Sequence, residues 1–225
     1  MPISAKTIDF LCENHLRDSR EWFLHNKSDY ERFVKEPLYE MIDALAPHMR
    51  AIDPLFVTEP RRALSRINRD TRFSNDKSLY RDHLWMTFTR KRGDLPTECA
   101  FYFEFTPFGF SYGCGFYHAG TDVMQAMRRL ILENNKVFLR ANKAYEAQDV
   151  FLLRGDLYKK NRYPDASPKL QDWLNRKNIY FSNQSEDFGL LFSNELVDVL
   201  ARDFKLLAPV YDFFTLILES KNDMI

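Results

Sequence analysis

The sequence has few cysteines and no long apolar run, and each absence removes a class of protein. Its three cysteines, Cys12, Cys99 and Cys114, are odd in number and widely spaced. They provide neither a disulfide framework nor a zinc-binding pattern, which predicts a reducing, cytoplasmic location. No stretch approaches the roughly 18 apolar residues of a membrane-spanning helix. The first residues also lack the apolar run of a signal peptide.

Neither sign of charge dominates the sequence. Lysine plus arginine and aspartate plus glutamate each number 32, so the formal net charge is zero. A neutral chain has no broad field that would draw it to nucleic acid or to an anionic membrane, so any attraction for charged ligands must be local. The sequence therefore predicts no membrane partner and disfavours nucleic acid without excluding it.

Common sequence signatures of enzymes are also absent. No His-x-x-x-His, Cys-x-x-Cys or paired-carboxylate spacing indicates a metal site, and no Gly-x-Ser-x-Gly indicates an acyl-transfer serine. We therefore expect no metal and no cofactor. The sequence leaves open whether the protein is an enzyme.

The composition that is present is that of a folded protein. Hydrophobic residues make up 45% of the 225 residues and charged residues 28%, which is far from the range of disordered chains. A chain of this length can bury a large core, and we expect its 20 phenylalanines to fill that core. No repeat or linker interrupts the sequence, which predicts one domain over residues 1–225.

Helical patterns dominate the first third of the sequence. Asp18 and Glu21 have the spacing of a capping box, which predicts a helix that begins there and ends before Pro37. A second helix is predicted from Pro37, with its end near Pro47. Its apolar residues recur at the spacing of one buried stripe: Leu38, Met41, Ile42, Leu45 and Met49.

After about residue 62 the hydrophobic period changes from 3.6 to 2. Apolar and polar side chains alternate over residues 84–89, 101–105 and 110–116, as is typical of strands. The turn residues Thr106-Pro107-Phe108-Gly109 predict a hairpin between the second and third of these strands. Short connections of this kind indicate an antiparallel sheet.

The rest of the chain is predicted to be mainly helical. Helices are expected at residues 121–133 and 136–146, a long loop at 155–168, a short helix at 169–177 and a short strand at 179–181. Ser193 is expected to cap a long closing helix that Pro209 kinks or splits. The pattern predicts an α+β fold, with an antiparallel sheet of about four to six strands, helices mainly on one face, an N-terminal helical pair and a long C-terminal helix.

Arginine is concentrated between residues 61 and 82. Seven basic residues against three acids give this segment a local charge of +4; the basic residues are Arg61, Arg62, Arg66, Arg69, Arg72, Lys77 and Arg81. The guanidinium group presents a planar fork of donors that suits carboxylate or phosphate. Several such groups on one short segment can form a clamp for a small phosphorylated or carboxylated ligand.

The same residues allow other interpretations. Arg69 can pair with Asp70 and Arg72 with Asp76, so that the cluster only braces the fold, although buried ion pairs add little net stability. Alternatively, the segment belongs to a metal-independent enzyme, a phosphoester hydrolase or transferase, in which Asp70 or His83 acts as the base.

A second candidate region is Gly113-Cys-Gly-Phe-Tyr-His118, which precedes the helix predicted from about Thr121. Glycine within a strand marks a bulge or a close approach by another backbone or a ligand. The N-terminus of the following helix provides a possible anion contact. For nucleic acid, the candidate stacking residues are Phe73 and Tyr80.

The most specific motif is the dodecapeptide Arg66-Ile-Asn-Arg-Asp-Thr-Arg-Phe-Ser-Asn-Asp-Lys77. With Trp22-Phe23, Tyr30 and Tyr80, it makes the sequence resemble the bacterial and fungal family of unknown function numbered 2461. Further matches are Phe10-Leu11, Arg17-Asp18, Lys27, Pro37, His83, Gly113 to Tyr117, Arg128, Gly155 and Lys177. The resemblance extends from about residue 7 to 218. It implies one compact domain with a shared site and names no chemistry.

These observations predict a site centred on the dodecapeptide. The predicted ligand-binding residues are Arg66, Asn68, Arg69, Arg72, Lys77, Tyr80 and Tyr117. The candidate catalytic residues are Asp70 and His83. The predicted function is the binding of a small anionic ligand.

Overall fold

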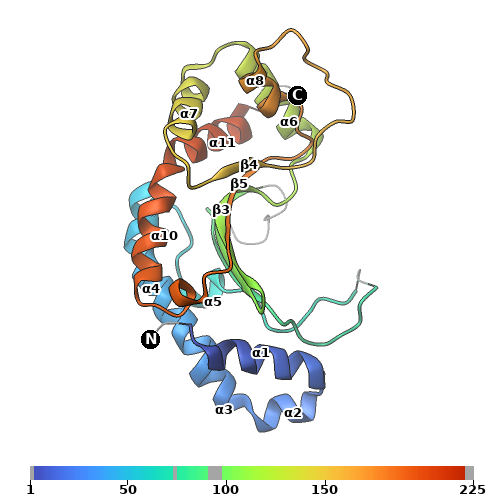
Figure 1. Cartoon of the computed structure of the whole chain (residues 1–225), viewed down its shortest axis with the longest axis vertical. Helices are drawn as coiled ribbons and strands as arrows, with labels where there is room; N and C mark the ends of the chain where they lie inside the picture. Colours follow the sequence, from blue (N-terminus) through green and yellow to red (C-terminus); the bar gives the residue numbers. More distant parts are fainter. Residues whose placement is uncertain (1–2, 73–74, 91–97, 221–225) are drawn as a thin grey trace. The chain divides into compact units, whose positions relative to one another are not determined.

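Helices and a five-stranded antiparallel sheet make up the protein in a computed structural model that describes residues 3–72, 75–90 and 98–220 (Figure 1). The predicted α+β fold class is confirmed. The chain divides into two compact units, each assembled from separate segments of sequence. The first unit comprises residues 1–88, 102–112 and 184–201, and the second comprises 89–101, 113–183 and 202–225. The expectation of one domain therefore stays a prediction.

The sheet has the strand order β1-β2-β3-β5-β4. Its strands are β1 (Leu84–Phe88), β2 (Cys99–Thr106), β3 (Gly109–Phe116), β4 (Leu152–Arg154) and β5 (Tyr180–Ser185). The predicted hairpin between β2 and β3 is confirmed, and Thr106 stabilises its turn by accepting the Phe108 N–H at 3.0 Å. Strand β4 was not predicted. It pairs with β5 in antiparallel register, with Leu153 opposite Phe181.

The first unit begins with consecutive helices that contact their neighbours (Figure 1). These are α1 (Ala5–Arg17), α2 (Arg20–His25), α3 (Lys27–Tyr30), the π-helical turn η1 (Glu31–Lys35), α4 (Glu36–Ile52) and α5 (Pro60–Ala63). Helix α9 (Phe188–Leu191) belongs to the same unit but comes much later in the chain. The predicted capping box is wrong, because Ser19 caps α2 by accepting the Trp22 N–H at 3.3 Å. Asp18 instead ends α1 in a left-handed conformation, with φ of 45°.

Helix α4 begins at Glu36 and has Pro37 in its first turn, as predicted, although α3, η1 and α4 follow one another without a break. Its end differs from the prediction, because the helix continues past Pro47 to Ile52. Proline inside a helix costs about 3 kcal/mol. Burial of the predicted stripe on both sides of Pro47, including Leu45 and Met49, offsets that cost.

The second unit contains helices α6 (Thr121–Leu132), α7 (Lys136–Glu146), α8 (Pro168–Leu174) and α11 (Ala208–Ser220). Helix α11 follows α10 (Glu195–Leu206), which the unit boundary divides, so the predicted closing helix is split next to Pro209. Ser193 accepts the Glu195 N–H at 3.0 Å, as the predicted cap requires. In the core, Trp173 is 1% exposed and meets Phe138 edge to face at 5.4 Å. Aromatic side chains fill this core, as predicted.

Among the described residues, no helix is both long enough and apolar enough to cross a membrane.

Candidate functional site

The dodecapeptide begins as one arm of an irregular hairpin in the first unit. Asn68 forms an antiparallel bridge with Tyr80, and Leu64 forms another with Met86, in the middle of β1. The Arg69 N–H donates to the Leu79 carbonyl at 2.9 Å. The backbone therefore pairs up to Arg69, and the rest of the dodecapeptide forms the connecting loop.

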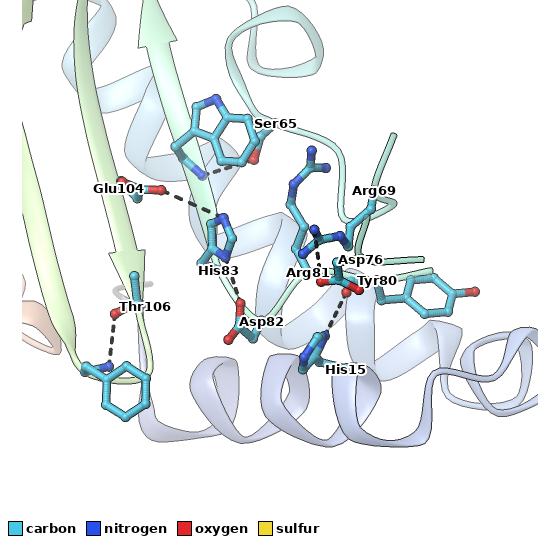
Figure 2. A network of polar contacts seen from close by, with 12 residues as sticks. His15, Ser65, Arg69, Asp76, Tyr80, Arg81, Asp82, His83, Glu104 and Thr106 are labelled. Atoms are coloured by element: carbon cyan, nitrogen blue, oxygen red, sulfur yellow. Dashed lines mark hydrogen bonds and ion pairs between the residues drawn. The ribbon is translucent and has the colours of Figure 1, made fainter. Parts of the chain in front are cut away.

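Helix α1 holds the returning arm of this hairpin in place. The left-handed turn at Asp18 lets its carboxylate accept the backbone N–H groups of Leu79 at 2.6 Å and Tyr80 at 3.3 Å. His15 contacts the Tyr80 carbonyl through Nδ1 at 2.8 Å (Figure 2). The Tyr80 ring stacks on Phe23 with a centroid distance of 5.1 Å and is only 2% exposed. The expectation of an exposed Tyr80 that stacks on bases is therefore wrong, and Phe73 lies outside the described residues.

The charged groups of the loop pair with one another. Arg69 contacts Asp76 at 3.0 Å, and Arg72 contacts Asp70 at 2.6 Å. Pairing is thus present, but with partners exchanged relative to the expected Arg69–Asp70 and Arg72–Asp76 pairs. The reason is the hairpin: Arg69 is at the end of one arm and meets the returning chain, whereas Asp70 and Arg72 are two residues apart on the same turn.

Pairing also fixes the acid–base properties of Asp70. Hydrogen bonds from the Arg72 side chain and backbone lower the pKa of Asp70 to about 2. A carboxylate with such a pKa is a weak base near neutral pH. Lys77 is engaged too, because its Nζ donates to the Thr71 carbonyl at 2.8 Å. These contacts give the loop a network that holds its own shape.

Arg66 differs from the other arginines of the dodecapeptide. Its carbonyl accepts a hydrogen bond from Arg81 at 3.0 Å, and Arg81 also donates to the Asn68 carbonyl. The Arg66 guanidinium, by contrast, is exposed and makes no hydrogen bond or ion pair with any residue that the structure describes. The Asn68 side chain is exposed as well.

Arg66 lines a pocket of about 210 Å³ within the first unit. One wall comes from the helical segment and consists of Tyr30, Lys35 and Tyr39; the other comes from Arg61 and residues 64–67. In a regular α-helix the five-residue step from Tyr30 to Lys35 would place these side chains on different faces. The π turn between them absorbs the extra residue, and all three helical side chains reach the pocket.

The pocket is rich in positive charge and in hydroxyl groups. Lys35, Arg61 and Arg66 bring three cations, and Lys35 forms an ion pair with Glu31. The Lys35 ammonium also lies 5.6 Å from the centre of the Tyr39 ring. Burial, with the nearby charge of Glu31, raises the pKa of Tyr30 to about 12. Its hydroxyl therefore stays protonated and can donate a hydrogen bond.

His83 belongs to a separate polar network in the first unit. Figure 2 shows its ring between two carboxylates, with Nδ1 2.7 Å from Asp82 and Nε2 3.9 Å from Glu104. The ring stacks on Trp85 with a centroid distance of 5.8 Å. An ionised Asp82 favours the proton on Nδ1, which leaves Nε2 able to accept one. The Asp82 carboxylate thereby holds the His83 ring in one orientation, as a general acid–base group requires.

The second predicted region lies in the other unit, so it is described by itself. Tyr117 is 87% exposed there. A Cβ atom added to Gly113 would lie 1.8 Å from the Phe181 carbonyl oxygen. The close approach that this glycine predicted is therefore made by the neighbouring strand β5.

Arg128 also has a structural environment in the second unit. It is 8% exposed and donates to the carbonyls of Leu174, at 3.0 Å, and of Arg176. Its guanidinium lies 5.4 Å from the centre of the Tyr158 ring. These contacts tie α6 to the segment that follows α8.

No group of three or more histidine, cysteine, aspartate or glutamate side chains among the described residues could hold a metal ion. The three cysteines are free, and the Sγ atoms of Cys99 and Cys114 lie 3.5 Å apart.

The fold and the pocket define an α+β protein in which an arginine-rich hairpin packs on N-terminal helices. A family model described as a conserved hypothetical protein (DUF2461) matches residues 6–213, so the chain belongs to that family, as its motifs predicted. No curated protein and no solved structure matches the chain.

Sequence reasoning found Arg66 but not the helical wall of the pocket. Lys35 and Tyr39 carried no motif, and their spacing from Tyr30 does not fit one face of an α-helix. A sequence signal was nevertheless present, since Pro37 stands where the hydrogen-bond register changes.

Proposed function

We propose that the protein binds a small anionic ligand, phosphorylated or carboxylated, in the pocket lined by Lys35, Arg61 and Arg66. The observation that carries this proposal is the convergence of these three cations on one cavity. A guanidinium fork matches the oxygens of phosphate and carboxylate, and an ammonium adds a compact charge. Protonated Tyr30 supplies a further donor.

The dodecapeptide has two roles in this proposal. Arg66 contacts the ligand, because its guanidinium has no partner among the described residues. Arg69 and Arg72 brace the loop through their aspartates. The sequence also allowed the arginines a purely structural role. In this proposal that role belongs to Arg69 and Arg72 in the loop and not to Arg66 in the pocket.

The size and charge of the pocket favour a compact ligand over a polymer. Its volume is about 210 Å³, which is below the range of typical drug-sized sites. A nucleic-acid interface would need a basic surface of greater extent, and the chain is neutral overall. Free cysteines agree with a cytoplasmic location, which we include in the proposal.

Ligand binding can be tested by titrating the protein with inorganic phosphate, a phosphomonoester and acetate in a calorimeter. Loss of one charged hydrogen-bonding partner costs about 1.5–3 kcal/mol, so Arg66→Ala should weaken binding roughly 10-fold to 100-fold. The affinity of Arg66→Lys should lie between those of the wild type and Arg66→Ala, because lysine keeps the charge and loses the guanidinium fork.

The matched control is Arg62→Ala. Arg62 is exposed, its nearest ion-pair partner is Glu59 at 3.9 Å, and it does not line the pocket. The same loss of charge there should change affinity less than about twofold, because exposed charges are screened. Equal losses in the Arg62 and Arg66 variants, or no binding of any of the three anions, would refute the proposal.

An enzyme remains the second candidate, a metal-independent phosphoester hydrolase or transferase. The observation that favours it is the Asp82–His83 pair, which has the geometry of an oriented acid–base group. A screen of phosphoesters should then find a turnover that His83→Gln abolishes. Asp70→Asn should retain that turnover, because Asp70 is engaged with Arg72 and is a weak base. Equal turnover in the wild type and His83→Gln would exclude this role of His83.

A further inference from the structure

A second hollow in the first unit has the opposite character to the cationic pocket. It is a shallow groove of about 290 Å³ between α1 and the segment from α2 to η1. Three aromatic rings line it: Phe10, Trp22 and Phe33. Phe10 and Trp22 contact each other at a centroid distance of 5.6 Å, so they form a continuous apolar wall.

Carboxylates surround these rings. Asp9, Glu13 and Asp29 line the groove together with one ammonium group, that of Lys6. Three negative charges and one positive charge leave the lining with a net charge of −2. Arg17 contacts Glu13 at 2.7 Å. The Asp9 and Asp29 carboxylates make no hydrogen bond or ion pair with any described residue, so their charge is not compensated within this part of the chain.

The aromatic wall already holds cations of the chain itself. The Lys6 ammonium lies 5.0 Å from the centre of the Phe33 ring, and the Arg32 guanidinium lies 5.1 Å from it. Both distances fall within the range of cation–π attraction. Phe10 is 8% exposed and supports Trp22 from behind, whereas Trp22 is partly exposed. No cation lies over Trp22 among the contacts of the described residues, which leaves this ring open to an external cation.

We propose that this groove binds a small organic cation with a quaternary ammonium head. Aromatic faces attract a cation through their quadrupole, and the N-methyl groups of a quaternary ammonium bury apolar surface against the rings. The Asp9 and Asp29 carboxylates supply the long-range attraction. A primary ammonium carries the same charge but has fewer methyl groups, so it buries less apolar surface against the rings.

The proposal can be tested by following the indole N–H signal of Trp22 in NMR titrations of the full chain with choline. The neutral isostere 3,3-dimethylbutan-1-ol has the same shape without the charge. Choline should bind at least about fivefold more tightly, as expected for a cation–π contact with at least one ring. Choline should also bind more tightly than methylammonium. Equal affinity for choline and the alcohol, or tighter binding of methylammonium, would overturn the proposal.

Substitutions of charged side chains that avoid the core provide the second arm. Asp29→Asn should weaken choline binding about threefold, whereas Glu21→Gln, an equal charge change on an exposed side chain that does not line the groove, should weaken it less. Lys6→Ala should strengthen binding, because it removes a competing cation from the groove. Weaker binding in Lys6→Ala, or equal effects of Asp29→Asn and Glu21→Gln, would contradict the proposal.

This inference does not depend on the function proposed for the cationic pocket. Arg66→Ala should abolish or weaken anion binding and leave choline binding intact, so the failure of one proposal is distinguishable from the failure of the other.

Discussion

Asp18 should be the residue whose loss most weakens the hold of α1 on the arginine-rich hairpin. It combines two structural features, and the segment that it holds lies about 60 residues later in the sequence. Its backbone is left-handed, with φ of 45°, and its carboxylate accepts the Leu79 and Tyr80 N–H groups at 2.6 and 3.3 Å. We therefore expect substitutions at this position to rank in a definite order.

The expected magnitudes follow from these two features. A hydrogen bond to a charged group contributes about 1.5–3 kcal/mol, and the left-handed conformation costs an ordinary residue about 1 kcal/mol or more. Asp18→Ala loses the acceptor and takes on the backbone cost, so it should lower the free energy of unfolding by about 3 kcal/mol. Asp18→Gly loses only the acceptor, for about 2 kcal/mol. Asp18→Asn keeps an oxygen acceptor and tolerates the backbone, for about 1 kcal/mol.

Urea denaturation of the three variants measures this order directly, and hydrogen exchange at the Leu79 and Tyr80 amides locates the effect. Both amides should exchange faster in Asp18→Ala than in Asp18→Asn. If Asp18→Ala were no more destabilised than Asp18→Asn, or if Asp18→Gly were the worst of the three, the assignment of Asp18 as a clamp would be wrong.

Two further predictions concern the loop and the sheet. The pKa of Asp70 is lowered in the folded state, so its stabilising contribution is present above its ordinary pKa of 3.8 and is lost as the pH falls through about 2. NMR titration of the Asp70 carboxyl should show this low midpoint. The Arg72→Ala substitution should return the midpoint towards 3.8. An unchanged midpoint in that variant would disprove the pairing. Gly113→Ala would place a Cβ 1.8 Å from the Phe181 carbonyl oxygen and should destabilise the protein by about 3 kcal/mol or more in thermal melts; a melting temperature equal to that of the wild type would rule out the close approach.

Regular periodicity explains which elements could be predicted from the sequence. The alternation in β1 and β2 and the stripe of α4 could be recognised because the burial of their side chains repeats with the period of the strand or helix. Strand β4 was missed, since three residues are too few to show a period. The end of α4 was misplaced at Pro47, because burial beyond the proline is a property of the packed core and not of the local sequence.

The sequence by itself determined the family and the α+β class, because these rest on composition, period and specific motifs. It also predicted a site at the dodecapeptide. Only the tertiary structure decided what each arginine contacts. Arg69 and Arg72 find their aspartates through the shape of the hairpin, whereas Arg66 meets Lys35 and Arg61 at a pocket that depends on a π turn. Ion-pair partners are set by distances in space, and residues about 30 apart in sequence carry no local sign that they will meet.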